Sequence, residues 1–338
     1  MKIAIVNVQV PFVRGGAESL ADSLAGRLGA RGHAVEVIRI PFKCSPPRAV
    51  ADQMLACRLL RVDAGGADRV VALKFPAYLV PFANKTVWLL HQFRQVYEQW
   101  DTPAGMPEDA EHRGLRDMIV RADDACLRQA RRVFTGSKVV AGRLKRFNGI
   151  AANEVLYPPP AHPELFRPGE FGDYFFCHGR QNAAGRQRLA VEAMRYVRSP
   201  FRLVLAGAPD SEGYGQELGD KVVFLGCVSE EEKARRMSEA RAVLDLSHDE
   251  DCCVYATLEA FHCHKPVVTL SDSVGANELI EDGRNGLVVE PSPQALAEAL
   301  EALYADRGRA RELGRAGHDT LAERRIDWDF VLDRLTAA

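Results

Sequence analysis

The sequence has almost no net charge and no long apolar run. Its 338 residues carry a formal net charge of −2, which gives no basic field for nucleic acid, so nucleic acid is not an expected partner. No apolar run approaches the roughly 20 residues that a membrane-spanning helix needs, so any membrane association is expected to be peripheral. A short β-branched strand is predicted over residues 3–8, and residues 1–6 lack the cleavage pattern of a signal peptide.

The sequence also lacks a disulfide framework and a zinc-binding pattern. Its eight cysteines are scattered along the chain, so we expect a reducing, cytoplasmic location. Cys252, Cys253, His262, Cys263 and His264 lie close together in sequence, but their spacing fits no common zinc pattern. Thiols are often simply buried as small hydrophobic groups. Neither a metal ion nor another cofactor is therefore expected.

What is present is the composition and periodicity of a two-domain α/β protein. Hydrophobic residues make up 47% and charged residues 27% of the chain, as in soluble globular proteins, and the length favours two domains. Apolar strands alternate with amphipathic helices in both halves, which predicts parallel sheets. A helix is predicted over residues 116–131 after a loop over 104–113. The predicted parts are a first domain (1–160), a proline-rich linker (161–172), a second domain (173–322) and a C-terminal helix that packs back on the first domain (323–338).

Two acids in the second half, Asp251 and Glu259, stand eight positions apart. This spacing is too wide for one helical turn, so Asp251 is expected in a loop and Glu259 near the start of a helix, where the helix dipole tolerates an anion. A loop with free backbone N–H groups that leads into a helix can bind phosphate and hydroxyl groups. An ordinary strand–loop–helix unit with two solvated acids fits the spacing as well.

The loops after two strands of the first half carry further candidates. Gly15 and Gly16 follow the first strand and can bring backbone N–H groups close to an anion at a helix N-terminus, although a tight turn without a ligand is the alternative. His91 follows the strand over 86–90, at the ligand-binding edge of a parallel sheet, where a structural histidine is equally common. Arg94 and Tyr97 are candidate acceptor contacts, or members of a packed loop.

The stretch around Glu259 resembles the E-x7-E region of the retaining, GT-B-fold glycosyltransferases of family four. The resemblance lies in Leu-Glu-Ala at 258–260, Lys-Pro-Val-Val at 265–268 and Glu-Asp-Gly-Arg-Asn-Gly-Leu-Val-Val at 281–289, and it extends over nearly the whole chain. It implies two Rossmann-like domains whose parallel sheets face a central cleft. It also implies transfer of a sugar from a nucleotide-sugar donor, with retention and without metal.

The resemblance also implies roles for individual residues. Glu259 would bind the ribose hydroxyls of the donor, Asp251 would lie near the transferred sugar, and His91 would face that sugar from the first domain. Further donor contacts, mostly through backbone groups, are implied at Gly15, Gly16, Gly207, Val228, Cys253, Val254 and Tyr255.

Two arginines are candidates for binding the donor diphosphate, whose negative charge grows as it leaves. Arg180 matches the first basic position of the family pattern. Gly185 stands where a lysine is expected, so Arg186 is the nearest substitute, and its planar guanidinium suits phosphate oxygens. Arg188 competes with Arg186 for this role, and a solvated basic loop is the alternative for the whole segment.

The sequence departs from the family pattern at the first acid as well. Asp251 is one methylene shorter than the usual glutamate, and Cys252-Cys253-Val254 replaces Gly-Phe-Gly, which removes backbone freedom. The leading hypothesis is a glycosyltransferase acting on a glycan, lipid-linked or small-molecule acceptor. The alternatives are a GT-B-fold nucleotide-sugar epimerase and a non-catalytic nucleotide-sugar-binding protein. The sequence specifies neither the donor, the acceptor nor the oligomeric state.

Overall fold

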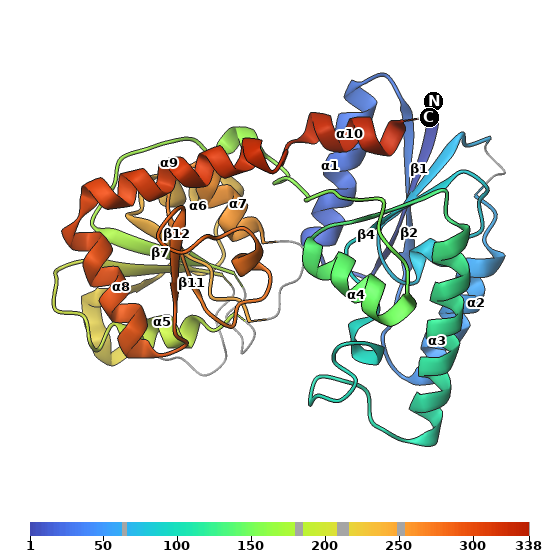
Figure 1. The fold of residues 1–338 in the computed structure, drawn as a ribbon, viewed down its shortest axis with the longest axis horizontal. Coiled ribbons are helices and arrows are strands. Elements are labelled where there is room, and N and C mark those ends of the chain that lie inside the picture. Colours follow the sequence, from blue (N-terminus) through green and yellow to red (C-terminus); the bar gives the residue numbers. More distant parts are fainter. Residues whose placement is uncertain (63–65, 180–184, 208–215, 249–253, 338) are drawn as a thin grey trace. The chain divides into compact units, whose positions relative to one another are not determined.

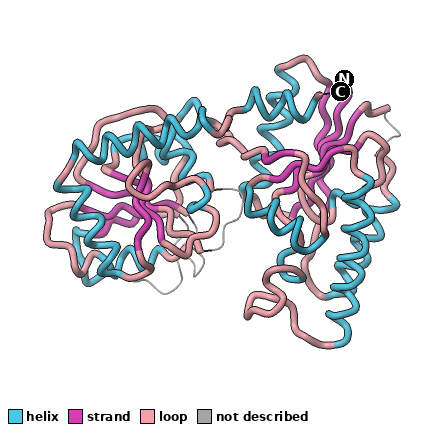
Figure 2. Tube along the Cα trace, in the orientation of Figure 1, coloured by secondary structure: helices cyan, strands magenta, loops and turns pink. Residues whose placement is uncertain are grey.

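The chain forms two compact units. The computed structural model describes residues 1–62, 66–179, 185–207, 216–248 and 254–337. The first unit comprises Met1–Ala161 and Trp328–Ala338, and the second comprises His162–Asp327. Each unit contains a six-stranded sheet with helices around it (Figures 1 and 2).

All strands of the first unit are parallel and follow the order β2-β1-β3-β4-β5-β6. The central strands β1, β3 and β4 are mostly apolar, as expected for strands covered on both faces; in β1, for example, Ile3, Ile5 and Val6 are all buried, whereas the edge strand β2 is only partly buried. The strands are β1 (Lys2–Gln9), β2 (Ala34–Pro41), β3 (Arg69–Ala72), β4 (Lys85–Leu89), β5 (Arg132–Thr135) and β6 (Glu154–Val155).

Helices cover both faces of this sheet. Figure 1 shows α1 and α10 on one side of it and α2 and α3 on the other. The helix α3 begins earlier than the sequence predicts, because Asp109 caps it by accepting a hydrogen bond from the backbone N–H of His112 at 2.9 Å. The helices are α1 (Gly16–Ala30), α2 (Pro47–Leu59), α3 (Ala110–Gln129), α4 (Lys138–Asn148) and α10 (Trp328–Thr336), with 3₁₀ turns η1 (Ala77–Leu79) and η2 (Arg94–Val96).

The C-terminal helix α10 is anchored within the first unit. The indole N–H of Trp328 donates to the carbonyl of Pro160 at 2.9 Å, and the guanidinium of Arg27 lies 5.0 Å from the centre of its ring. At the other end, the buried Arg69 donates to the carbonyl of Leu335. A carbonyl at a helix C-terminus lacks a partner within the helix, so this arginine both satisfies it and fixes the helix on the sheet.

The second unit repeats the same plan with strand order β12-β11-β10-β7-β8-β9, again all parallel. Figure 1 shows α5 and α8 on one side of this sheet and α6, α7 and α9 on the other. The strands are β7 (Tyr174–His178), β8 (Arg202–Ala206), β9 (Val222–Phe224), β10 (Ala242–Leu244), β11 (Val267–Leu270) and β12 (Gly286–Val289). The helices are α5 (Gln187–Ala193), α6 (Glu230–Glu239), α7 (Tyr255–His262), α8 (Pro293–Ala305) and α9 (Arg307–Glu323), with 3₁₀ turns η3 (Pro163–Leu165), η4 (Gln216–Lys221) and η5 (Ala276–Glu278).

The side chains of β7 alternate between the two faces of the sheet, and this alternation determines which of them point towards α6 and α7. Phe175 and Cys177 point into the core beneath α5 and α8. Because successive side chains of a strand point to opposite faces, Tyr174, Phe176 and His178 point towards the other helical layer. His178 is therefore the last residue of the strand, and its side chain lies on the side of α6 and α7.

Residues 162–172, predicted as a linker, belong to the second unit. The buried ammonium of Lys265 donates to the carbonyls of Gly169 at 3.0 Å and Glu170 at 2.8 Å, and it lies 3.5 Å from the centre of the Phe171 ring. These three contacts hold the segment against the turn that precedes β11.

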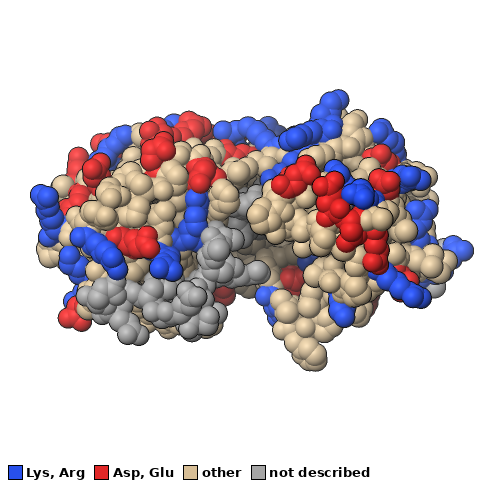
Figure 3. Space-filling model, turned by 90° about the horizontal axis from the view of Figure 1, so that it is seen from below, with Lys and Arg blue, Asp and Glu red and all other residues tan. Residues whose placement is uncertain are grey.

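The predicted α/β class with parallel sheets is confirmed. Among the described residues, none of the helices combines the length and the hydropathy required to span a membrane. Lys and Arg side chains alternate with Asp and Glu side chains on the face shown in Figure 3, consistent with the small net charge.

Candidate functional site

Glu259 is a buried carboxylate on α7 with two basic neighbours from other elements. Its side chain is only 6% exposed, and its Oε1 lies 2.8 Å from Nζ of Lys233 on α6. Its Oε2 lies 3.3 Å from Nε2 of His178, the last residue of β7. The three side chains meet at the carboxyl edge of the second sheet, the edge at which α/β proteins bind ligands.

The two contacts of Glu259 differ in quality. The Lys233 contact is a charge-assisted hydrogen bond of normal length. The His178 contact lacks hydrogen-bond geometry, and within the described part of the chain neither Oε2 of Glu259 nor Nε2 of His178 has a hydrogen-bond partner. We therefore treat the histidine contact as an electrostatic one.

The electrostatics of this group keep the carboxylate ionised. Burial alone raises the pKa of Glu259, but His178 and the charge of Lys233 outweigh it, so the pKa lies below its usual value. Burial lowers the pKa of Lys233, but Glu259 and Glu230 raise it by more, so the net shift of this pKa is upwards. Both shifts describe a buried ion pair in which each partner holds its charge.

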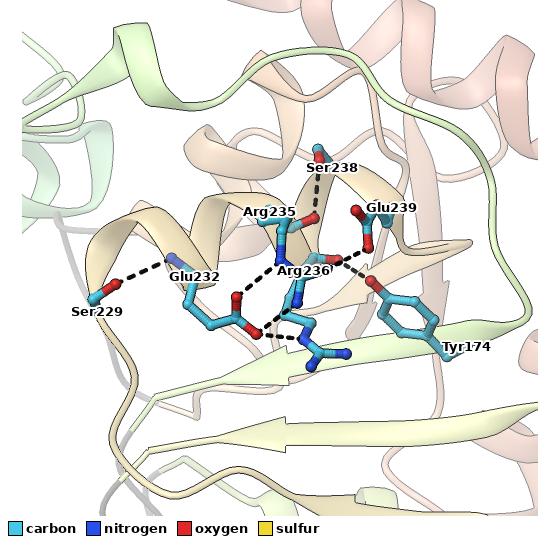
Figure 4. Close-up of polar contacts among 7 residues, drawn as sticks. All are labelled: Tyr174, Ser229, Glu232, Arg235, Arg236, Ser238 and Glu239. Atoms are coloured by element: carbon cyan, nitrogen blue, oxygen red, sulfur yellow. Dashed lines mark hydrogen bonds and ion pairs between the residues drawn. The ribbon is translucent and has the colours of Figure 1, made fainter.

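Helix α6, which carries Lys233, is held in place by contacts that do not involve Glu259. Figure 4 shows these contacts. Ser229 caps the helix by accepting from the N–H of Glu232 at 3.2 Å, and Glu232 accepts from Arg236 at 2.8 Å. The hydroxyl of Tyr174, on β7, donates to the carbonyl of Arg236 at 2.6 Å. This last bond fixes α6 relative to the strand that carries His178.

Arg186 lies at the start of α5 and is already engaged. Its Nε donates to the carbonyl of Leu246 at 2.7 Å, its Nη1 pairs with the carboxylate of Asp272 at 2.7 and 2.8 Å, and its Nη2 donates to Ser273 at 2.9 Å. These partners follow β10 and β11, so the arginine joins two loops at the carboxyl edge of the sheet. Its predicted competitor Arg188 is largely exposed and pairs with Glu192 at 3.2 Å.

Gly207 follows β8 and closely approaches the residue that follows β7. Its φ is +144°, and a Cβ atom placed on it would lie 1.9 Å from the carbonyl oxygen of Gly179. Only glycine fits there. Its N–H donates to the carbonyl of Gly226 at 2.8 Å, in the loop that leads through the half-buried Val228 to α6.

The remaining predicted residues of the second unit divide into two groups. Val254 is buried and stands at the N-terminus of α7, where its carbonyl accepts from Leu258, and the half-buried Tyr255 begins the helix. Arg180, Asp251 and Cys253 lie outside the described residues, as do Glu250 and Cys252. The first acid of the motif and the first diphosphate candidate therefore remain predictions from the sequence.

In the first unit, the glycine pair at the start of α1 is capped by a side chain of the helix itself. The N–H of Gly15 donates to Oε2 of Glu18 at 2.9 Å, and Oε1 of Glu18 lies 2.9 Å from Nζ of Lys74. Burial raises the pKa of Glu18, but Lys74 and the Gly15 N–H lower it more, so the net shift is downwards. Gly16, the first helical residue, is therefore next to a fixed negative charge. A glutamate three residues after the N-cap matches the glutamate half of a capping box, so the sequence contains a local signal for this contact.

His91 lies just beyond β4 and is half-buried. Its Nδ1 lies 2.7 Å from the carbonyl oxygen of Gln92. A carbonyl can only accept, so Nδ1 carries the proton and the neutral ring keeps a lone pair on Nε2. Burial lowers the pKa of His91, with a smaller opposing effect of the Gln92 carbonyl, which favours this neutral form.

The structure places the two candidate acceptor residues in a packed loop. Arg94 donates to Glu98 at 2.7 Å, and Glu98 also lies 3.0 Å from Arg143. Tyr97 is only 4% exposed, and its hydroxyl donates to the buried carboxylate of Asp123 at 2.8 Å. Its hydroxyl is thus turned into the interior. Asp123 lies 26 positions further along the chain, so no local sequence pattern predicts this pairing.

The cluster of possible metal ligands is only partly described. Cys263 is buried, and the ring of His264 stacks on that of His318 with 4.0 Å between centroids. Across the described ranges, no three His, Cys, Asp or Glu residues are grouped so as to hold a metal ion.

Comparison with solved structures defines the fold class. Sucrose-phosphate synthase from Thermosynechococcus elongatus superposes with a TM-score of 0.76 at 20% sequence identity, over 99% of this chain and 97% of that one. Together with the two parallel six-stranded sheets, this likeness shows that the protein has the GT-B fold, as the sequence predicted.

Comparison of sequences identifies the family that the second unit resembles. Residues 172–306 match the family model described as Glycosyl transferases group 1. Alpha-maltose-1-phosphate synthase of Mycolicibacterium smegmatis is 30% identical over 167 residues, which cover 44% of this chain and 43% of that protein. The D-inositol 3-phosphate glycosyltransferase of Xylanimonas cellulosilytica is 24% identical over 383 aligned positions, which cover 93% and 89%. The chain thus matches less than half the length of the first of these relatives.

Proposed function

We propose that this protein is a glycosyltransferase that moves a sugar from a nucleotide-sugar donor to an acceptor hydroxyl. The observation that carries the proposal is Glu259, an ionised carboxylate held by two side chains at the ligand-binding edge of the second sheet. It lies within the segment that matches the group 1 glycosyl transferases. The relatives named above, a synthase and a glycosyltransferase, support the same class of reaction.

The second unit would bind the nucleotide part of the donor. An ionised carboxylate accepts hydrogen bonds from hydroxyls, so Glu259 suits the ribose. The N–H groups of Gly179 and Gly207, where β7 and β8 end, already donate to the carbonyls of Ala206 and Gly226, so contacts to the diphosphate would come from cationic side chains. Because Arg186 already joins the loops after β10 and β11, Arg180 is the stronger candidate for contacting the diphosphate directly.

In the first unit, His91 is the candidate contact to a sugar hydroxyl, whereas the N–H of Gly15 at the start of α1 is already taken by Glu18. A neutral His91 with a free lone pair on Nε2 can accept a hydrogen bond from a sugar hydroxyl. The acceptor, which this unit would bind, is a glycan, a lipid-linked saccharide or a small molecule. A role in the synthesis of polysaccharides or related glycoconjugates fits this range.

In the reaction, the bond between C1 of the sugar and the diphosphate oxygen breaks, and the nucleoside diphosphate leaves with the electron pair. The acceptor oxygen bonds to C1, and its proton passes to the diphosphate oxygen that leaves. Fixed cations and backbone N–H groups that face the developing charge stabilise it. Following the family resemblance, we propose retention at C1, Asp251 near the transferred sugar, and no requirement for metal.

Release of nucleoside diphosphate from uridine, guanosine and adenosine diphosphate sugars tests the proposal. We expect Glu259→Ala and Arg180→Ala to lower the rate about a hundredfold or more, since each removes a charged contact to the donor. Glu312→Ala, at a glutamate of the same unit whose side chain is 69% exposed, is the control and should keep the wild-type rate. Normal turnover by Glu259→Ala would show that the site is wrongly assigned.

A non-catalytic nucleotide-sugar-binding protein is a second candidate, and two observations favour it. Gly185 supplies no cation where the family pattern has a lysine, and Arg186 is engaged elsewhere. Donor binding without turnover against any acceptor extract would support this candidate. Conversion of the donor in the absence of any acceptor would instead indicate the epimerase.

A further inference from the structure

Lys233 is a buried lysine whose ammonium is held from two sides. Its side chain is 12% exposed, and Nζ lies 2.8 Å from Glu259 and 2.8 Å from Glu230. The ammonium also lies 5.3 Å from the centre of the Phe166 ring, within the range of a cation–π contact. In a buried site such contacts are stronger than in water, so the position of Lys233 is well fixed.

His178 is a weaker neighbour of the same carboxylate. Its Nε2 lies 3.3 Å from Oε2 of Glu259 without hydrogen-bond geometry. Its ring centre is 5.9 Å from that of Phe176, and the two rings are nearly parallel. A carboxylate has about four sites for accepting hydrogen bonds. Among the described residues Lys233 fills one with a proper hydrogen bond, and Oε2 accepts none.

We propose that Lys233 positions Glu259 for recognition of the ribose, and that His178 occupies the place that a ribose hydroxyl takes when the nucleotide binds. This inference rests on the proposed function, because it assumes that Glu259 meets a ribose. The lysine keeps Oε1 and so fixes the orientation of the carboxylate. The contact of His178 with Oε2 lacks hydrogen-bond geometry, so a ribose hydroxyl can replace it without a hydrogen bond having to break.

The assignment makes the two basic residues unequal in their effect on binding. Without Lys233, the carboxylate would lose its hydrogen-bonded ammonium and with it its fixed orientation. It would then discriminate poorly between a ribonucleotide and its 2′-deoxy counterpart. Without His178, Oε2 would be open to the ligand, and discrimination would persist.

Calorimetric titration with uridine, guanosine and adenosine diphosphates and their 2′-deoxy counterparts tests the inference. For the wild type we expect the ribonucleotide to bind about tenfold or more tightly than the deoxynucleotide, as for loss of one charge-assisted hydrogen bond. In Lys233→Met this ratio should fall to about twofold or less. Lys233→Arg, which keeps the charge, should restore most of it.

Two further variants make the test specific. His178→Ala should keep the wild-type ratio within about twofold and bind the ribonucleotide at least as tightly, since it removes only a competing contact. Glu230→Gln removes the other partner of Lys233 and should also leave the ratio unchanged. Circular dichroism of each variant shows whether it is folded.

The outcomes separate the inference from the function on which it rests. If the wild type binds none of the three ribonucleotides, both fail. If it binds one and discriminates, but Lys233→Met retains the full ratio, the inference alone is overturned. If His178→Ala lowers the ratio of ribonucleotide to deoxynucleotide affinity as much as Lys233→Met does, the proposed difference between the roles of Lys233 and His178 is wrong.

Discussion

Glu259 and Asp123 are buried carboxylates whose surroundings shift their pKa values in opposite directions. Burial raises both values, but Lys233 and His178 more than offset it for Glu259. Around Asp123 the effect of burial is opposed only in part by the hydroxyls of Tyr97 and Tyr78, and its pKa is raised to about 7. Whether a basic side chain lies close to the carboxylate thus decides which group is ionised at neutral pH.

Asp123 should make the stability of the protein depend on pH. An aspartate in an unfolded chain has a pKa of about 3.9. Because the pKa of Asp123 is higher in the folded state, the folded state binds this proton more tightly. The stabilisation from this group is therefore fully present below about pH 4 and is lost as the pH rises to about 7. Asp123→Asn should flatten this slope and unfold with a free energy about 1–2 kcal/mol higher than the wild type at pH 8.

Urea denaturation at pH 5, 6, 7 and 8 measures this effect. Asp117→Asn, on the same helix but with a side chain that is 69% exposed, serves as the control and should follow the wild-type curve. An Asp123→Asn variant with the wild-type slope would contradict the raised pKa.

At the scale of single elements, the alternation of strands and helices was predictable, but their polar connections were not. Strand β1 was predicted over residues 3–8 and spans Lys2–Gln9, because an apolar β-branched run is a local signal. The contacts of Arg186 with Asp272 and of Lys233 with Glu259 join residues 86 and 26 positions apart. Such pairings depend on how strands are ordered in the sheet, and no local pattern encodes them.

The same reason explains the residues whose surroundings the sequence did not indicate. Tyr97 was a candidate surface contact because of its residue type and its place in a loop, yet its hydroxyl donates to the buried Asp123 on α3. Residues 162–172 have the prolines and glycines of a linker, yet Lys265 holds three of them. The assignment of Glu259 to a ligand site came from the family resemblance, and the structure adds its partners.

The contacts of Arg186 lead to a prediction at the element scale. If Arg186 acts by joining the loops after β10 and β11, Arg186→Met and Asp272→Asn should weaken nucleoside diphosphate binding by similar factors. The double variant should then be little worse than either single variant, because both remove one contact. Calorimetry of the three variants measures the coupling. If Arg186 instead contacts the diphosphate directly, Asp272→Asn should leave affinity unchanged or raise it.

At the scale of the whole molecule, the chain begins and ends in the same unit. Helix α10 returns to the first unit after the second is complete, and Trp328, Val331, Leu332 and Leu335 bury their side chains there. The two units therefore differ in how far they depend on the C-terminus.

Trp328→Ala should destabilise the first unit selectively. Removal of a buried tryptophan costs about 3 kcal/mol or more, and here the hydrogen bond to Pro160 is lost as well. Limited proteolysis followed by mass spectrometry should show earlier cleavage within residues 1–161, with nucleotide affinity of the second unit retained. Leu59→Ala, at a leucine that is 69% exposed, should leave the cleavage pattern unchanged. Earlier cleavage in the second unit would contradict the division.

The central claim is that the second unit binds a nucleotide through the Glu259 carboxylate. Calorimetric titration of the wild type and Glu259→Gln with the best-binding nucleoside diphosphate at pH 7.5 tests it most directly, because the substitution keeps the size of the side chain and removes its charge. The account predicts that Glu259→Gln loses about tenfold or more in affinity while remaining folded. Equal affinity of the two proteins would contradict it.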